Sequence, residues 1–182
     1  YYPETAEGVS DSFPLVVFSH GAFGYYQSNT STYMELASNG YVVVSLDHPH
    51  HSFFTQDTAG RIILVDQGFI GSVMEIGDST DPNANAEEKL SLYQDWMELR
   101  TADIGFVLDA IEAAKAEKEM SDIWFLSKGS HDNIRSVLEK IDMQSVGLMG
   151  HSMGGAASAA LGRERKDVSA VIDLDGTMLA EY

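Results

Sequence analysis

Residues 145–161 read SVGLMGHSMGGAASAAL, and this stretch decides the fold. The apolar run at 145–149 is typical of a buried strand, and the small-residue run at 154–161 predicts a helix. Between them, residues 150–154 (GHSMG) match G-x-S-x-G, the pattern of a sharp strand-to-helix turn that exposes its serine. Glycines are needed two residues before and two residues after the serine, because side chains at those positions would collide within the sharp turn. The pattern makes Ser152 a candidate nucleophile.

Three further apolar runs predict strands around this turn. They lie at residues 13–19, 41–46 and 168–174. Such runs are typical of strands buried in a parallel sheet. A helix is expected at 30–39, where Thr32 and Glu35 have capping-box spacing and Gly40 falls at a C-cap position. Strand, helix and strand with short connections form a unit whose strands run parallel.

A long helical pattern runs from Ala86 towards Glu117. Its expected buried stripe includes Trp96, Leu99, Phe106, Val107 and Ile111. Its expected solvated charges are Glu87, Glu88, Asp95, Glu112 and Glu117. Arg100 and Asp103 are helical i, i+3 neighbours, so we expect a weak ion pair of about 0.2–0.5 kcal/mol that serves only the scaffold.

Residues 47–85 break the pattern of alternating strands and helices, apart from some strand character at 62–65. The stretch carries apolar residues that look exposed: Phe53, Phe54, Phe69, Ile70, Val73 and Met74. An irregular stretch of this length is usually a lid or a binding loop, and its apolar content argues against disorder. We interpret residues 48–85 as a lid-like insertion in a single domain of residues 1–182.

Composition limits the class of protein. With 182 residues, 44% of them hydrophobic, the chain suits one globular core. A net charge of −17 would repel a nucleic-acid backbone, so we expect no nucleic-acid partner. No apolar run reaches the roughly 18 residues of a membrane span. Without cysteines there is no disulfide framework, and the sequence gives no basis for a compartment or an oligomeric state.

A serine nucleophile needs amide donors for the oxyanion of its intermediate. One donor is expected from the residue after the serine, Met153, and the other from the loop that follows the first strand, at Ala22. Gly21, Phe23 and His151 are the expected substrate contacts beside them. Two further phenylalanines, Phe53 and Phe54, are candidates for an acyl pocket, although packing is the simpler role for each phenylalanine.

Four blocks of the sequence resemble the α/β-hydrolase superfamily, and in particular the plasma-type (isoform II) platelet-activating factor acetylhydrolase family. They are FPLVVFSHGAFG (13–24), ASNGYVVVSLDHPHHS (37–52), VGLMGHSMGG (146–155) and VIDLDGTM (171–178). The resemblance implies a mostly parallel sheet with helices on both faces. It also implies a serine lipase that cleaves short or oxidised sn-2 acyl groups from phospholipids without a metal or other cofactor.

The same resemblance implies roles for individual residues. It carries over Ser152 as nucleophile, the amides of Ala22 and Met153 as oxyanion hole, and Asp175 as triad acid. Asp173 is the rival acid on the same face, but Asp175 stands at the carboxyl end of its strand, where ligands gather in such sheets.

The general base is missing from the expected place. In this fold a histidine follows the serine and the acid, yet all six histidines precede Ser152. We therefore expect the chain to be a fragment that alone will not turn over; the alternatives are a base from a separate chain and an inert serine. The abrupt start at Tyr1, without a signal segment, agrees with the fragment hypothesis.

Other functions stay open at this point. His48-Pro49-His50-His51 invites a metal hypothesis, but proline disrupts helical ligand spacing and no cysteine or third-ligand motif accompanies it. The resemblance instead places Asp47 and His48 near the mouth of the site. A general carboxylesterase or polyester hydrolase is the nearest alternative, and a non-catalytic binding module that keeps the elbow only as a turn is the alternative from another class.

Overall fold

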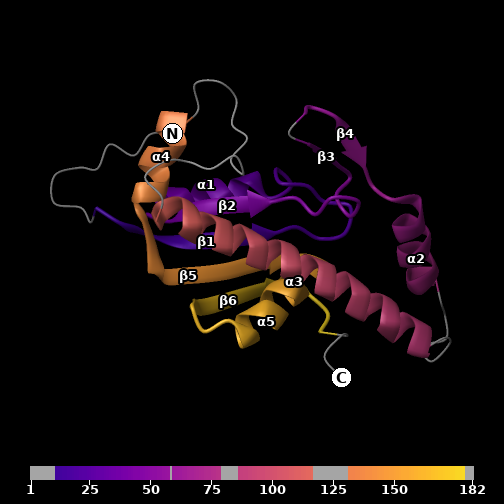
Figure 1. Ribbon diagram of the computed structural model, residues 1–182. Helices are drawn as coiled ribbons and strands as arrows, with labels where there is room; N and C mark the ends of the chain where they lie inside the picture. The colour runs from indigo at the N-terminus through magenta and orange to yellow at the C-terminus, as the bar shows by residue number, and fades with distance from the viewer. Residues whose placement is uncertain (1–10, 58, 79–85, 117–130, 179–182) are drawn as a thin grey trace.

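A computed structural model describes residues 11–57, 59–78, 86–116 and 131–178, and its centre is a parallel sheet. The four strands are β1 (Phe13–Ser19), β2 (Val42–Leu46), β5 (Ile141–His151) and β6 (Val168–Leu174). They are ordered β2-β1-β5-β6, and every neighbouring pair is parallel (Figure 1). The carboxyl ends of all four strands therefore meet at one edge, and the predicted strands are confirmed.

Helices cover both faces of this sheet, as the sequence predicts. They are α1 (Thr30–Ser38), α3 (Ala86–Ala116), α4 (His131–Glu139) and α5 (Met153–Glu164). Successive residues of β1 point to opposite faces. Leu15 and Val17 belong to the larger core cluster with side chains of α3, α4 and α5, whereas Phe18 packs against Tyr33 and Leu36 of α1.

The segment between β2 and α3 is more regular than the sequence suggests. Strands β3 (Phe54–Gln56) and β4 (Ile62–Leu64) form an antiparallel hairpin, and α2 (Gln67–Asp78) follows. The expectation of a largely irregular stretch is wrong for these residues. The strands are too short to show a period. For α2 two signals were overlooked: the helical spacing of Phe69, Ile70, Val73 and Met74, and Asp66, whose side chain accepts a hydrogen bond from the Phe69 amide at 2.9 Å, as N-cap residues do. The lid-like role stays a prediction.

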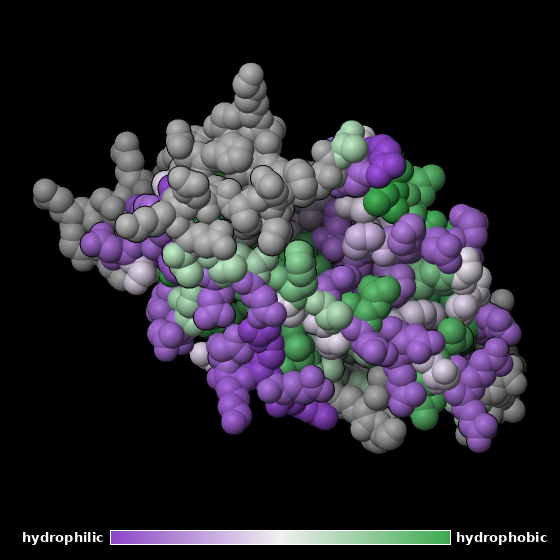
Figure 2. Space-filling model, viewed as in Figure 1, coloured by the Kyte–Doolittle hydropathy of each residue, from purple (hydrophilic) through white to green (hydrophobic). Residues whose placement is uncertain are grey.

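Exposed apolar side chains gather on this hairpin and its surroundings. Phe53, Ile62, Leu64 and Met74 are each more than half exposed. Figure 2 shows hydrophobic side chains at the surface where β4 lies in Figure 1. Among the described residues, no helix is both long and apolar enough to cross a membrane.

Two helices differ from the sequence expectation in detail. Helix α1 already begins at Thr30, so the capping box assigned to Thr32 and Glu35 is wrong. Its end agrees with the prediction, because Gly40 has a φ of +88° and its amide donates to the carbonyl of Ala37. Helix α4 was not predicted.

The buried stripe of α3 has another register than predicted. Leu99 is 39% and Phe106 61% exposed, so neither belongs to the stripe. The buried residues are Trp96, Arg100, Ile104, Leu108, Ile111 and Ala114. The described acidic residues of the predicted wet face are exposed, and Glu117 lies outside the described residues. The sequence pattern did not predict these buried positions because one of them is a charged residue, Arg100, whose partners come from other elements.

Candidate active site

Ser152 occupies a strained turn between β5 and α5. Its backbone has a φ of 52° and a ψ of −126°, a combination that side chains rarely allow. A Cβ atom on Gly150 would collide with the backbone of Gly154, and one on Gly154 would collide with the carbonyl of Ser19. Both glycines are therefore required for the turn, as the G-x-S-x-G pattern predicts.

Backbone hydrogen bonds fix this turn while leaving its hydroxyl unengaged. The Ser152 amide donates to the carbonyl of Leu174 at 2.8 Å, and its carbonyl accepts from the Gly155 amide at 2.9 Å. Within the described part of the chain, no hydrogen bond involves the Ser152 hydroxyl. Ser152 is half-buried, and no described histidine makes a hydrogen bond with its hydroxyl.

The loop after β1 lies directly against the elbow. We call residues 20–24 the oxyanion loop, after the role predicted for the amide of Ala22. A Cβ atom on Gly21 would lie 3.0 Å from Nδ1 of His151 and 3.2 Å from Cβ of Ser152. The structure thus brings together Gly21, His151 and Ser152, three of the residues that the sequence assigned to one site.

Hydrogen bonds within the oxyanion loop orient the amide of Ala22. The carbonyl of Gly21 accepts from the Gly24 amide at 3.1 Å and from Nδ1 of His20 at 2.6 Å. Because C=O and N–H point in opposite directions across a trans peptide, the Ala22 amide points away from these two donors. Neither the Ala22 nor the Met153 amide donates a hydrogen bond to another residue of the described ranges, so both are available to a ligand.

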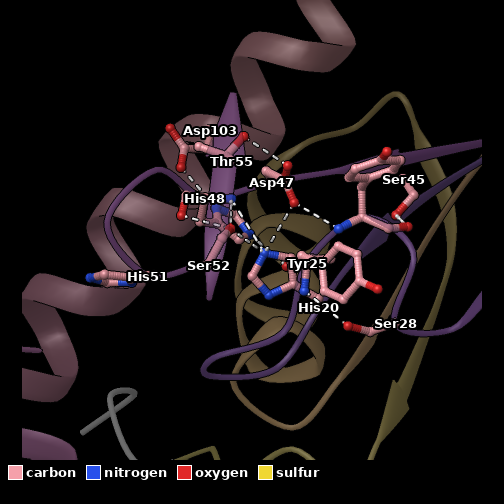
Figure 3. Close-up of polar contacts among 12 residues, drawn as sticks. His20, Tyr25, Ser28, Ser45, Asp47, His48, His51, Ser52, Thr55 and Asp103 are labelled. Atoms are coloured by element: carbon pink, nitrogen blue, oxygen red, sulfur yellow. Dashed lines mark hydrogen bonds and ion pairs between the residues drawn. The ribbon is translucent and has the colours of Figure 1, made fainter. Parts of the chain in front are cut away.

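The partners of His20 decide its protonation. Nδ1 faces a carbonyl, which only accepts, so Nδ1 carries the proton; Nε2 accepts from the amide of His48 at 3.3 Å and lies 2.9 Å from the Ser52 hydroxyl (Figure 3). Burial of this fully enclosed side chain is the main cause that lowers the pKa of His20 to about 4. His20 is therefore a neutral ring at physiological pH.

A second serine lies in a hydrogen-bonded chain behind the loop. The Ser19 hydroxyl is 2.8 Å from Nε2 of His48, and Nδ1 of His48 is 2.8 Å from Oδ2 of Asp103 (Figure 3). We call Ser19, His48 and Asp103 the buried triad, because the Ser19 and His48 side chains have no exposed surface. Sequence reasoning missed this cluster, since its members lie 29 and 55 residues apart.

Burial shapes the charges in the buried triad. Burial, reinforced by the Arg100 guanidinium, holds the pKa of His48 far below its usual range, so His48 is neutral. Burial also raises the pKa of Asp103 to about 6, against the attraction of Arg100. At neutral pH, a neutral His48 donates to an ionised Asp103 and accepts from Ser19, the same direction of donation as in a catalytic triad.

These contacts correct the expectation for Arg100 and Asp103, and they bear on the metal hypothesis for His48. Arg100 and Asp103 do not form a surface ion pair: Arg100 is fully buried and its Nη1 donates to the His20 carbonyl at 2.6 Å, while Asp103 binds His48. Both ring nitrogens of His48 are engaged by Ser19 and Asp103, so they are not available to a metal. In the part of the chain that the structure describes, no group of three or more His, Cys, Asp or Glu side chains is arranged to hold a metal ion.

The two candidate acids have different surroundings. Asp173 accepts the Gly176 amide at 2.8 Å, and its carboxylate fills the space that a Cβ atom on Gly155 would need, so it ties the loop after β6 to α5. Asp175 is exposed, has a φ of 61°, and makes no hydrogen bond within the described ranges. It follows Leu174, whose carbonyl holds the Ser152 amide, so Asp175 lies beside the elbow and is free to accept a hydrogen bond.

The candidate substrate contacts are distributed around the oxyanion loop. Phe23 has a φ of 60°, and its ring lies 5.5 Å from that of Phe69, whereas the ring of Phe54 packs at 5.3 Å from that of Tyr25. Phe53 is 61% exposed, so packing in the core is the wrong role for it. His151 is exposed beside Gly21.

A hollow of about 500 Å³ lies between α3, α5 and the segment after β6. Its lining includes Met97, Thr101, Ala160 and Met178, but neither Ser152 nor Ala22. We therefore do not place the acyl group there.

Comparison with known proteins gives three results. The sequence model of the family described as "Platelet-activating factor acetylhydrolase, isoform II" matches residues 4–180. Platelet-activating factor acetylhydrolase of Canis lupus familiaris is 24% identical over 177 residues, 93% of this chain and 36% of the relative; that of Bos taurus is 23% identical over 154 residues, 80% of this chain and 31% of the relative. The chain thus spans about a third of the length of these curated relatives.

A solved structure shares the fold. The ferulic acid esterase from Streptomyces cinnamoneus superposes with a TM-score of 0.57 at 27% identity, over 91% of this chain and 37% of that enzyme. Together with the parallel sheet and the elbow, this similarity shows an α/β-hydrolase fold.

Proposed function

Because the chain belongs to the family of platelet-activating factor acetylhydrolase, isoform II, we propose that it carries the nucleophile of a serine carboxylic-ester hydrolase. The observation that supports this function most is the strained backbone of Ser152, held between two glycines that admit no side chain. Strain of this kind is kept at functional sites because it presents a group to a ligand. An ordinary glycine-rich turn would not need it.

The proposed reaction is a two-step acyl transfer. The Ser152 oxygen attacks the ester carbonyl, and the amides of Ala22 and Met153 donate to the oxyanion that forms. The alcohol leaves with a proton from the base, and water then releases the acyl group. In this proposal Asp175 orients a histidine from outside the described residues, which takes the serine proton.

We assign the substrate to the class of short-acyl lipid esters, because the curated relatives are named platelet-activating factor acetylhydrolases. A general carboxylesterase is the second candidate, favoured by the similarity to a ferulic acid esterase. Hydrolysis of an sn-2 acetyl phospholipid by the full-length protein, compared with short and long p-nitrophenyl esters, separates the two. Equal rates on all of these esters would contradict the lipid preference.

Labelling with a fluorophosphonate tests the nucleophile itself. We expect the full-length protein to be labelled, and Ser152→Ala to lose both the label and at least about 10⁴-fold of kcat. Ser19→Ala is the matched control, because Ser19 is also a serine with a hydrogen-bonded histidine but has no exposed surface. Absence of labelling from the unaltered protein would favour a binding module instead. Labelling that persists in Ser152→Ala would place the nucleophile at another residue.

A further inference from the structure

We propose that Arg100 is a positioning residue for the oxyanion hole, because its guanidinium holds the carbonyl of His20 and thereby keeps the oxyanion loop in place beside Ser152. The inference rests on the proposed function. It adds a residue of α3 that does not itself contact the substrate.

The burial of Arg100 requires an explanation. Its side chain has no exposed surface and lies in the buried stripe of α3 next to Ile104. Apolar residues in place of buried ion pairs are often neutral or even stabilising, so stability alone does not account for a charge at this position. One guanidinium nitrogen, Nη2, finds no hydrogen-bond partner in the part of the chain that the structure describes. A costly and incompletely bonded charge is typical of a functional position.

The bonds that Arg100 does make all lead to the oxyanion loop. Nη1 donates to the His20 carbonyl at 2.6 Å, a short bond strengthened by the charge of the donor. Nε donates to Nδ1 of His51 at 3.4 Å, and the carbonyl of His51 in turn accepts the amide of Phe23 at 3.2 Å. Arg100 thus supports the loop directly at His20 and, through His51, at Phe23.

The same carbonyl also contacts the elbow. A Cβ atom on Gly154 would collide with the carbonyls of Ser19 and His20, which shows how closely the end of β1 packs on the first turn of α5. The His20 oxygen therefore lies close both to the Arg100 guanidinium and to Gly154 of the elbow.

Loss of this contact should misdirect the Ala22 amide. The His20 carbonyl belongs to the first peptide of the loop, and the Ala22 amide belongs to the next one. An oxyanion donor stabilises the transition state only when it is oriented before the charge develops. Without Arg100 the first peptide can rotate, and the second peptide then loses its direction.

The charge of Arg100 also acts on the ring of His20. After burial, the guanidinium contributes to lowering the pKa values of His20 and His51. A neutral His20 keeps Nε2 as an acceptor for the His48 amide, so its Nδ1 stays directed at the Gly21 carbonyl. Arg100 thereby supports the second peptide of the loop as well as the first.

The test uses the full-length protein with Arg100→Met, Arg100→Lys and, as matched control, Arg165→Met. Arg165 is a surface arginine that pairs with Asp109 and Asp167, away from the elbow. Active sites are counted by fluorophosphonate titration, and kcat and KM are then measured per labelled site. Binding of a trifluoromethyl ketone, whose adduct carries an oxyanion, reports on the amide donors directly.

We expect Arg100→Met to lower kcat per labelled site tenfold or more and to weaken trifluoromethyl ketone binding by a similar factor, with KM changed less than twofold. Arg100→Lys should recover part of both, because it keeps the charge and the apolar stem. Arg165→Met should match the unaltered protein.

If the role of Arg100 is purely structural, its variants will have fewer labelled sites, but kcat per labelled site and ketone binding will be unchanged. That result would overturn the proposal. If Arg100→Met does not fold, Arg100→Lys decides by the same two measurements. A protein that is not labelled even when unaltered would overturn the proposed function, and the inference with it. Labelled variants with unchanged kcat would overturn the inference alone.

Discussion

Two serines of this molecule, Ser19 and Ser152, each have a different part of what a catalytic serine needs. Ser19 has a histidine and a carboxylate in line at 2.8 Å each, but no exposed surface. Ser152 is half-buried on a strained turn, with an unengaged hydroxyl and two amides nearby that donate to no described residue, but it has no described base. The two positions are close in space, since the Ser19 carbonyl packs against Gly154 of the elbow.

The difference teaches that a Ser-His-Asp chain of hydrogen bonds is not sufficient evidence for catalysis. A substrate carbonyl must reach the hydroxyl, and amide donors must face the developing oxyanion. The buried triad meets neither condition. Its hydrogen bonds instead join the end of β1, the loop after β2 and helix α3, and so support the loop that carries the predicted oxyanion donor, Ala22.

The largest expected effect concerns the acid that Ser152 needs. Asp175→Asn should lower kcat by about 10⁴-fold without changing the melting temperature, because a catalytic carboxylate orients and stabilises its histidine. Asp173→Asn, the matched control, should lower the melting temperature and leave most of kcat, because Asp173 holds the Gly176 amide. Steady-state kinetics and thermal unfolding of both full-length variants check this. The reverse pattern would make Asp173 the acid.

The next effect tests whether the turn at Ser152 depends on its glycines. Gly154→Ala should destabilise the protein by more than about 3 kcal/mol, because its Cβ atom would collide with backbone that cannot move aside cheaply. Urea denaturation measures the loss. Gly71→Ala, at a helical glycine with open space around it, is the control and should not destabilise the protein. A small effect at Gly154 would show that the elbow is not strained as described.

Acid should lower the free energy of unfolding, because the histidines buried around Ser19 would have to be protonated. The pKa values of His20 and His51 are lowered to about 4, so the unfolded chain binds more protons between about pH 6.5 and pH 4. Stability is therefore complete above pH 6.5 and is lost as the pH falls towards 4. The pKa of Asp103 is raised to about 6, and its protonation offsets part of this loss of stability. Burial also holds the pKa of His48 far below its usual range, which adds to the loss. From pH 7 to pH 5 we therefore expect a net loss of more than about 2 kcal/mol in the free energy of unfolding.

Urea denaturation at both pH values measures this loss. His51→Gln should reduce the pH dependence, whereas His50→Gln, at an exposed neighbour, should leave it unchanged. A stability that does not depend on pH in this range would contradict a buried neutral cluster.

The smallest effect comes from Ser19 itself. Ser19→Ala should lower the free energy of unfolding by roughly 1–2 kcal/mol, because Nε2 of His48 loses its buried partner. The kcat per labelled site should stay within a few-fold of the unaltered protein. A loss of kcat comparable to that of Ser152→Ala would break the distinction between the two serines.

Some elements were predictable because their causes are local. The strands at 13–19 and 168–174 follow from short apolar runs, and the elbow follows from two glycines whose missing side chains are a steric requirement of the turn itself. The loop after the first strand indicated Ala22, and family resemblance added Asp175; the roles of both residues stay predictions. Helix α2 was missed because its apolar residues, at helical spacing over 69–74, were interpreted as exposed residues of an irregular lid.

The sequence by itself determined the sheet, the elbow and the residue that the elbow presents, since these depend on neighbours along the chain. Only the tertiary structure decided which serine is enclosed, which of Asp173 and Asp175 is engaged, and where the charge of Arg100 lies. Those outcomes depend on packing between residues far apart in the chain, such as Arg100 against His20 and His48 against Asp103. The physical reason is that hydrogen bonds inside a core form only where folding removes water and brings such partners into reach.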